Sequence, residues 1–203
     1  MPTKLRERYR SAFRAEILAA ARELIKEHGY EGVTLRKLAQ RTQCSPMALY
    51  TYFADKQALL AALASEGFQK LAKRHESAGQ REPLSALRQI MLDHIAFAEE
   101  NPTEYRILFL SERSLDEAKK SRREIEENNP AFRFLFKSVQ SCLEAGVFKG
   151  DAFAISTIVL TAAHGAASLL IRGSFPFDSH RRYAEEVVAT ALSGLQNRMI
   201  RAL

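Results

Sequence analysis

The sequence lacks a long uninterrupted hydrophobic segment. Its most apolar stretch, residues 152–171, is interrupted by Ser156, His164, Gly165 and Ser168. A membrane-spanning helix needs about 20 predominantly apolar residues, so we expect this stretch to form a buried helix. The opening residues, MPTKLRERYR, contain no apolar core of a signal peptide. We therefore expect a cytoplasmic protein without a membrane partner.

Cysteine is also scarce. The two residues, Cys44 and Cys142, lie far apart in the sequence, whereas cysteine-based metal sites use closely spaced pairs. This spacing predicts no metal site and two small, reduced, mostly buried thiols. Cys44 falls in a predicted turn, so a redox role there is an open alternative to packing.

Patterns typical of enzymes are missing too. We find no paired nucleophile and base, no glycine-rich phosphate loop and no metal-ligand spacing. The sequence therefore predicts neither catalysis nor a cofactor. No segment alternates between apolar and polar residues between hairpin turns, so we expect an all-α fold.

The positive charge is concentrated in the first quarter of the chain. The net charge is +6, and residues 1–56 contain 11 Lys and Arg against 6 Asp and Glu. A basic surface of this kind is typical of proteins that bind a polyanion such as DNA. A basic tail that only keeps the chain soluble is the alternative. It is disfavoured because Arg36, Lys37 and Arg41 continue the charge into predicted helices.

Residues 34–56, TLRKLAQRTQCSPMALYTYFADK, have the pattern of two short helices joined by a tight turn. Thr34 is a helix-capping residue, and Ser45-Pro46 forms a second helix start, because Pro fits the first helical position. The helix that follows carries tyrosines, a threonine and small residues. A short helix of this composition is suited to reach phosphates and base edges, so the segment predicts a DNA-binding helix-turn-helix.

The remaining elements follow from apolar spacing and helix breakers. A first helix is expected from about Tyr9 to His28, ended by Gly29, with Lys4, Arg6, Arg8 and Arg10 forming a mobile arm before it. We expect a DNA-binding domain at 1–56, a connecting fourth helix at 55–78 that begins at Asp55, and a second domain at 79–203. The further helices are expected at 83–100, 102–112, 113–127, 130–146, 151–172 and 178–202.

The stretch from Ile17 to Leu60 resembles the N-terminal domain of the TetR family of bacterial transcriptional regulators. The resemblance rests on ILAAARELIKEHGYEGVTLRKLAQ, on the LY-x-YF run that begins at Leu49, and on DKQALL from Asp55. Residues 161–170 also resemble a C-terminal subgroup named for a Trp-His-Gly signature, with Ala163 in place of the Trp. The family implies a three-helix DNA-binding head and a larger helical bundle for ligand binding and dimerisation.

This resemblance implies roles for individual residues. Phosphate contacts are expected from Thr34, Tyr50, Tyr52 and Lys56, next to the capping Ser45, and base contacts from Arg36, Met47, Ala48 and Thr51. Alternatively, Tyr50 is a core aromatic packed on Phe53, or Arg36 is a solvated helix charge. The family usually has Gly where this chain has Gln43 and often where it has Met47, so the operator sequence cannot be transferred from relatives.

The second domain contains aromatic residues and histidines at helical spacing. They are candidates for lining an effector cavity between bundle helices, although core packing is an alternative for each one. The candidates are His94, Phe97, Tyr105, Phe109, Phe132, Phe136, Phe153 and His164.

The last two predicted helices are apolar over much of their surface, which the resemblance explains by pairing in a homodimer. We therefore expect a ligand-responsive transcriptional regulator, a repressor that binds a palindromic DNA operator as a homodimer and responds to a small apolar or aromatic effector. A nonspecific architectural DNA-binding protein is the alternative.

Overall fold

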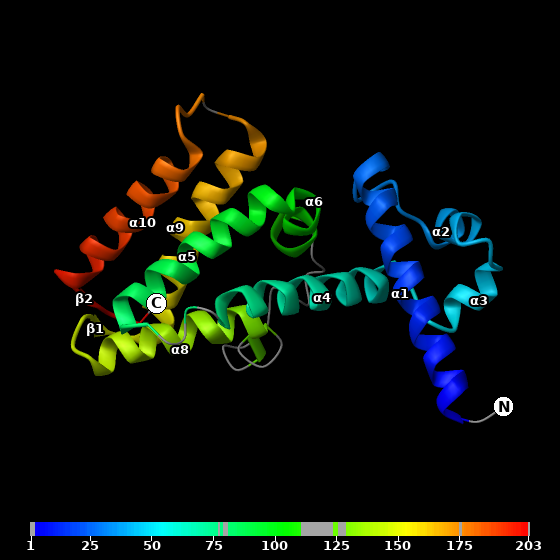
Figure 1. Ribbon diagram of the computed structural model, residues 1–203, viewed down its shortest axis with the longest axis horizontal. Helices are drawn as coiled ribbons and strands as arrows, with labels where there is room; N and C mark the ends of the chain where they lie inside the picture. Colours follow the sequence, from blue (N-terminus) through cyan, green and yellow to red (C-terminus); the bar gives the residue numbers. More distant parts are fainter. Residues whose placement is uncertain are drawn as a thin grey trace. The chain divides into compact units, whose positions relative to one another are not determined.

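The computed structural model describes residues 3–76, 78, 81–110, 124–125, 129–174 and 176–202. The described part is almost entirely helical, which confirms the predicted all-α fold (Figure 1). The chain forms two compact units. One comprises Met1–Gly67 with Thr103–Ser111, and the other Phe68–Pro102 with Glu112–Leu203. The helix α4, Lys56–Glu76, contributes residues to both.

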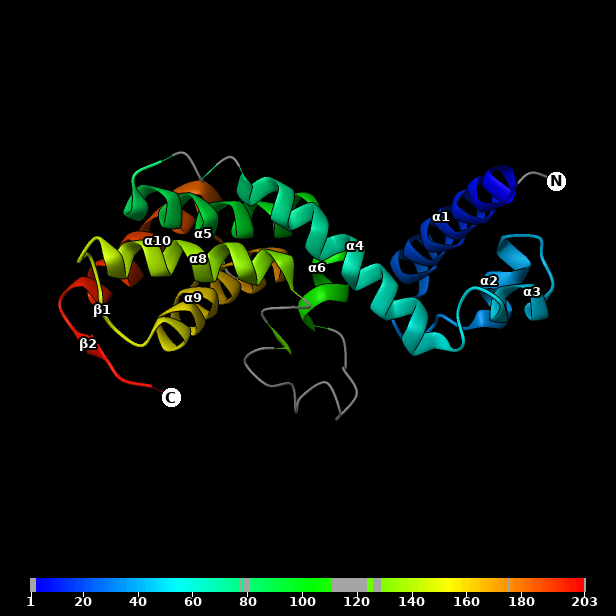
Figure 2. The same ribbon diagram turned by 90° about the horizontal axis from the view of Figure 1, so that it is seen from below.

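The first unit is built on α1, Thr3–His28. Two short helices, α2 at Leu35–Arg41 and α3 at Pro46–Tyr50, lie side by side next to it in both views (Figures 1 and 2). The apolar faces of these helices and of the first part of α4 meet in one core. Its fully buried members include Ile17, Leu18, Ala21, Val33, Leu38, Leu49 and Leu59.

Polar side chains fix the starts of the short helices. The hydroxyl oxygens of Thr34 and Ser45 accept hydrogen bonds from Lys37 N at 3.2 Å and Ala48 N at 3.1 Å. The carboxylate of Asp55 accepts from Ala58 N at 2.7 Å at the start of α4. Each cap satisfies a backbone N–H that has no partner within its helix. The three predicted caps are therefore confirmed.

The turn between α2 and α3 has a left-handed residue that is not glycine. Gln43 has a φ of 51°, in the region that side chains with a Cβ adopt at a cost. We expect Gln43→Gly to raise the free energy of unfolding of the first unit by up to about 1 kcal/mol. Urea denaturation would measure this.

The same substitution three residues earlier provides the control for this prediction. Gln40 lies inside α2, so Gln40→Gly should lower stability by about 1 kcal/mol, because glycine is a poor helix former. Changes of the same sign in both variants would contradict a strained Gln43.

The predicted start of the first helix was wrong. Helix α1 begins at Thr3 rather than near Tyr9, so Lys4, Arg6, Arg8 and Arg10 belong to a helix and not to a mobile arm. The apolar pattern marks only the turns that pack on the core, and residues 4–12 are exposed. Extending an existing helix is much easier than starting one, which explains why the exposed turns continue it.

The helix expected at 102–112 is divided in the structure. Helix α6, Pro102–Tyr105, is followed by a π-helical turn, η1, at Arg106–Leu110. Apart from Pro102, both belong to the first unit, where Ile107 joins the core. The helix predicted at 113–127 lies outside the described residues, apart from residues 124–125, which are helical.

The second unit is a helical bundle. It comprises α5 at Pro83–Glu100, α8 at Pro130–Glu144, α9 at Ala152–Arg172 and α10 at His180–Gln196. Helix α9 packs against the other three (Figure 2). It is the one described helix that is long and apolar enough to cross a membrane by length and composition alone. About 44% of its apolar window is buried inside the chain, by the contacts with these three neighbours, so the expected burial is only partial.

Two short strands were not predicted. The strands β1, Lys149–Gly150, and β2, Met199–Ile200, pair in parallel. Gly150 has a φ of 131°, and a Cβ built on it would clash with the carbonyl oxygen of Ile200. The helix predicted at 178–202 was therefore too long, because α10 ends at Gln196 and the chain then pairs with β1.

Candidate DNA-binding interface

Helix α3 exposes most of its surface. Of its five residues only Leu49 is buried. The side chain of Met47 is 75% exposed and that of Tyr50 is 53% exposed. The alternative role of Tyr50 as a core aromatic is therefore wrong, whereas Phe53 is buried. The helix presents a mixed apolar and hydroxyl-bearing face to solvent, as a groove-binding helix requires.

The side chains of the two residues that follow α3, Thr51 and Tyr52, are each fixed by a contact within the chain. The hydroxyl group of Thr51 donates to the carbonyl oxygen of Ala48 at 2.7 Å, so its oxygen stays directed along the helix end. The ring of Tyr52 is half-buried and packs edge-on against Phe13, with centroids 5.4 Å apart. Tyr52 thus supports the fold, and its place at the surface is fixed by that contact.

Helix α2 carries two arginines in different surroundings. Arg41 forms a two-point ion pair with Glu27, at 2.5 and 2.7 Å. The same hydrogen bonds lower the pKa of the Glu27 carboxyl and raise the pKa of Arg41. Arg36 lies five residues earlier and is exposed. Arg41 therefore already has a partner within the chain, whereas Arg36 is an exposed arginine of α2.

Lys56, expected to contact phosphate, lies at the first position of α4. Its ammonium nitrogen is 3.8 Å from a carboxylate oxygen of Glu31 and 4.9 Å from the centroid of the Tyr30 ring. These contacts hold the side chain near the start of α4, where the helix dipole also favours an anion. A phosphate at this position would compete with the exposed Glu31 carboxylate.

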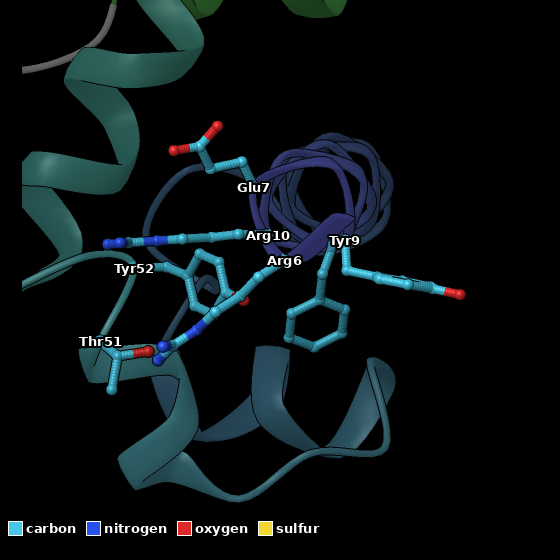
Figure 3. A pocket seen from close by; sticks show the side chains of 7 residues that line it. Arg6, Glu7, Tyr9, Arg10, Thr51 and Tyr52 are labelled. Atoms are coloured by element: carbon cyan, nitrogen blue, oxygen red, sulfur yellow. The ribbon is translucent and has the colours of Figure 1, made fainter. Parts of the chain in front are cut away.

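The structure adds a pocket that the sequence did not predict. It has a volume of about 730 Å³ and lies between the first turns of α1 and residues 51–52, which directly follow α3 (Figure 3). Its lining residues are Arg6, Glu7, Tyr9, Arg10, Phe13, Thr51 and Tyr52. The spacing of Arg6 and Arg10 could have indicated a shared helix face, but only if the helix had been extended to Thr3.

The predicted effector residues fall into separate groups. In the second unit His94 lies next to His164, with ring centroids 6.4 Å apart, and Phe132 contacts Phe136 and Phe153. Phe97 is also buried in this unit. Tyr105 and Phe109 contact each other, at 4.8 Å, within the first unit. A cavity lined by all of these residues stays a prediction.

Histidine is buried in an unusual way in the second unit. His75 and His94 are 2% and 3% exposed. Burial lowers the pKa of His75 to about 4, helped by the nearby Arg74 cation and opposed by the backbone of Ala131. Burial, together with His75 and His164, lowers the pKa of His94 to about 3. Both rings are therefore neutral near pH 7.

Neither cysteine belongs to a metal site among the described residues. No group of three or more His, Cys, Asp or Glu side chains in that part of the chain could hold a metal ion. Cys142 is buried, which raises the pKa of its thiol to about 11 and makes it unreactive. Cys44 is half-buried, and its sulfur lies 3.2 Å from the hydroxyl oxygen of Thr42.

Comparison with known proteins agrees with this architecture. Residues 17–63 match the model of the bacterial regulatory proteins of the tetR family, and residues 87–191 match that of the Tetracyclin repressor-like C-terminal domain. The chain belongs to the TetR family. A TetR-family protein is a DNA-binding transcriptional regulator, and proteins of this family bind DNA operators and small-molecule effectors.

Individual relatives show where the similarity lies. The HTH-type transcriptional repressor AcnR of Corynebacterium efficiens is 45% identical over 60 residues, which cover 30% of this chain and 32% of that protein. This chain thus matches about a third of the length of such curated relatives.

Solved structures extend the likeness of fold to most of the chain. A protein of unknown function from Rhodococcus sp. RHA1 has a TM-score of 0.74 at 24% identity, over 90% of this chain and 94% of the other. The regulator FadR from Bacillus subtilis, solved in complex with stearoyl-CoA, has a TM-score of 0.72 at 19% identity, over 89% and 98%. At these identities the likeness establishes the fold alone.

Proposed function

We propose that this TetR-family protein is a cytoplasmic repressor that binds a pseudo-palindromic operator as a homodimer and releases it when a small effector binds. The observation that supports the proposal most strongly is the exposed surface of α3, which we call the recognition helix. Helix α3 is fixed to the core by Leu49 and capped by Ser45, and its Pro46, Met47 and Tyr50 are exposed.

The proposed DNA contacts follow from chemistry and exposure. Tyr50, Tyr52, Thr34 and Lys56 supply hydroxyl and ammonium groups for phosphates, which position the helix in the groove. The residues proposed to face base edges are Arg36, Met47, Ala48 and Thr51. Ser45 caps the start of α3 and so fixes the position of that helix. An arginine that binds guanine through two hydrogen bonds favours it over another base by about 1–3 kcal/mol.

The proposed homodimer forms through α9 and α10. Several apolar residues on these helices stay half-buried in the isolated chain, although others on the same helices are fully buried. A second copy would cover them, and two-fold symmetry would place two recognition helices about 34–36 Å apart, one turn of DNA. These half-buried residues include Ile158, Ala162, Leu169, Val187 and Ala191.

The proposed effector site lies in the second unit, among those candidates that belong to it: His94, Phe97, Phe132, Phe136, Phe153 and His164. We propose a small apolar or aromatic effector. It regulates DNA binding only insofar as it binds the released conformation more tightly than the DNA-bound one. The assignment to the Trp-His-Gly subgroup, based on Ala163-His164-Gly165, stays part of this proposal.

Fluorescence anisotropy tests the proposed function. The labelled probe is the intergenic DNA upstream of the gene, and the control is a scrambled duplex of equal length and composition. We expect the intergenic probe to bind at least about a thousandfold more tightly at physiological salt. Equal affinity for both duplexes would instead support a nonspecific architectural protein. Sedimentation of the protein alone tests the homodimer.

A further inference from the structure

The first turns of α1 carry an excess of positive charge. Lys4, Arg6, Arg8 and Arg10 are all exposed, and Glu7 is the only acidic residue among positions 3–10. Like charges four residues apart repel each other, and cations at a helix N-terminus oppose the helix dipole. A bound polyanion would relieve both effects.

These four cations divide between two faces of the helix. Residues four apart are separated by about 40° around the axis, so Arg6 and Arg10 share one face. Lys4 and Arg8 share another, rotated by about 200° from the first. Of the four, Arg6 and Arg10 line the pocket, and both extend from α1 toward Thr51 and Tyr52 (Figure 3).

The opposite wall of the pocket is the segment that follows the recognition helix. The Thr51 hydroxyl group is tied to Ala48 O, and the Tyr52 ring is tied to Phe13. The guanidinium carbon of Arg10 lies 5.9 Å from the centroid of that ring, which holds the cation at the pocket. The two walls are therefore preorganised, and they lie directly beside the exposed Tyr50.

We propose that this pocket binds a backbone phosphate of the DNA strand next to the recognition helix, with Arg6 and Arg10 as its cationic contacts. The inference rests on the proposed DNA-binding function. Guanidinium groups match phosphate oxygens through paired hydrogen bonds, so the two arginines supply the donors, whereas the Thr51 hydroxyl hydrogen is already donated to Ala48 O. Glu7 is the one carboxylate at the pocket, and it extends away from Thr51 (Figure 3). Two cations thus outweigh one anion.

The salt dependence of DNA binding tests this phosphate site. The probe is a labelled duplex of about 30 base pairs of random sequence, measured between about 50 and 300 mM NaCl. Each lost phosphate contact lowers the slope of log K against log salt by about 0.9. The double variant Arg6→Gln, Arg10→Gln removes both cations from the one phosphate and should therefore lower the slope by about 0.9 and the affinity at 0.1 M salt by about 8-fold.

Two further double variants serve as controls. The variant Lys4→Gln, Arg8→Gln removes the same charge from the other face, and we expect less than half the change in slope. Arg6→Lys, Arg10→Lys keeps the charge, so its slope should stay near that of the unmodified protein. Circular dichroism confirms that α1 stays helical in each variant.

Equal losses of slope in the two Gln variants, or no loss in Arg6→Gln, Arg10→Gln, would overturn the proposal. The first result would mean that general charge acts rather than this pocket, and the second would leave the pocket to a different anion. A different result would contradict the proposed repressor function: equal affinity of the unmodified protein for intergenic and scrambled DNA.

Discussion

Leu49→Ala will lower both the stability of the first unit and its affinity for the operator. Leu49 is fully buried and is the only buried residue of α3, a helix of five residues. Helices shorter than about 12–15 residues are marginal on their own, so the position of α3 depends on this anchor and on the Ser45 cap. Removing a buried leucine side chain costs about 2–5 kcal/mol. We expect affinity for the intergenic probe to fall by more than about tenfold, the equivalent of 1.4 kcal/mol.

Met47→Ala is the matched control for this variant. Met47 lies two residues earlier on the same helix and is 75% exposed. Its removal should change the free energy of unfolding by less than about 0.5 kcal/mol and should alter only the preference among DNA sequences. Urea denaturation followed by circular dichroism measures stability, and anisotropy measures binding. A Leu49→Ala protein as stable as Met47→Ala would show that α3 is held by other contacts.

The helix starts in the first unit could be predicted because they depend on residues that are close together in the sequence. Caps at Thr34, Ser45 and Asp55 are local features, because each hydrogen bond joins residues three apart. Local hydrogen bonds of this kind are encoded in adjacent residue types. Helix α5 was predicted with its observed bounds for a similar reason, since Pro83 and Pro102 mark its ends.

Features that depend on distant residues could not be predicted in this way. The pairing of Lys149–Gly150 with Met199–Ile200 joins segments about fifty residues apart, and two-residue strands are too short to show alternation. The pocket at Arg6 and Arg10 requires both the extended α1 and the fixed position of Tyr52. The predicted effector residues show the same limitation, since helical spacing alone did not separate Tyr105 from His94.

Acidification below pH 6.5 will destabilise the second unit before any carboxylate of ordinary pKa is protonated. The cause is the pair of buried histidines His75 and His94. The charged groups around them are Arg74 on α4, Asp93 on α5 and the half-buried His164 on α9. Arg74 is itself paired with Glu100 at 2.5 Å, which holds its side chain in place, and its cation lowers the pKa of His75.

The sign follows from the lowered pKa values. Both histidines have a pKa of about 6.5 when unfolded, against about 4 and about 3 in the folded protein. The unfolded chain therefore binds more protons below pH 6.5, and stability falls with pH down to the folded values. By pH 5 each histidine removes about 2 kcal/mol, a large part of a typical total of about 5–15 kcal/mol.

Denaturation with urea at pH 8, 7, 6 and 5 measures this loss. Stability should be nearly constant between pH 8 and 7 and should then fall, and His94→Gln and His75→Gln should each flatten the fall by about half. His164→Gln should have a smaller effect, because that ring, whose pKa burial also lowers, is only half-buried. NMR provides a test that does not depend on variant stability, since the ring protons of His75 and His94 should not titrate between pH 7.5 and 5. Titration of either ring in that range would mean that water reaches it in the folded state, and the acid sensitivity would then need another origin.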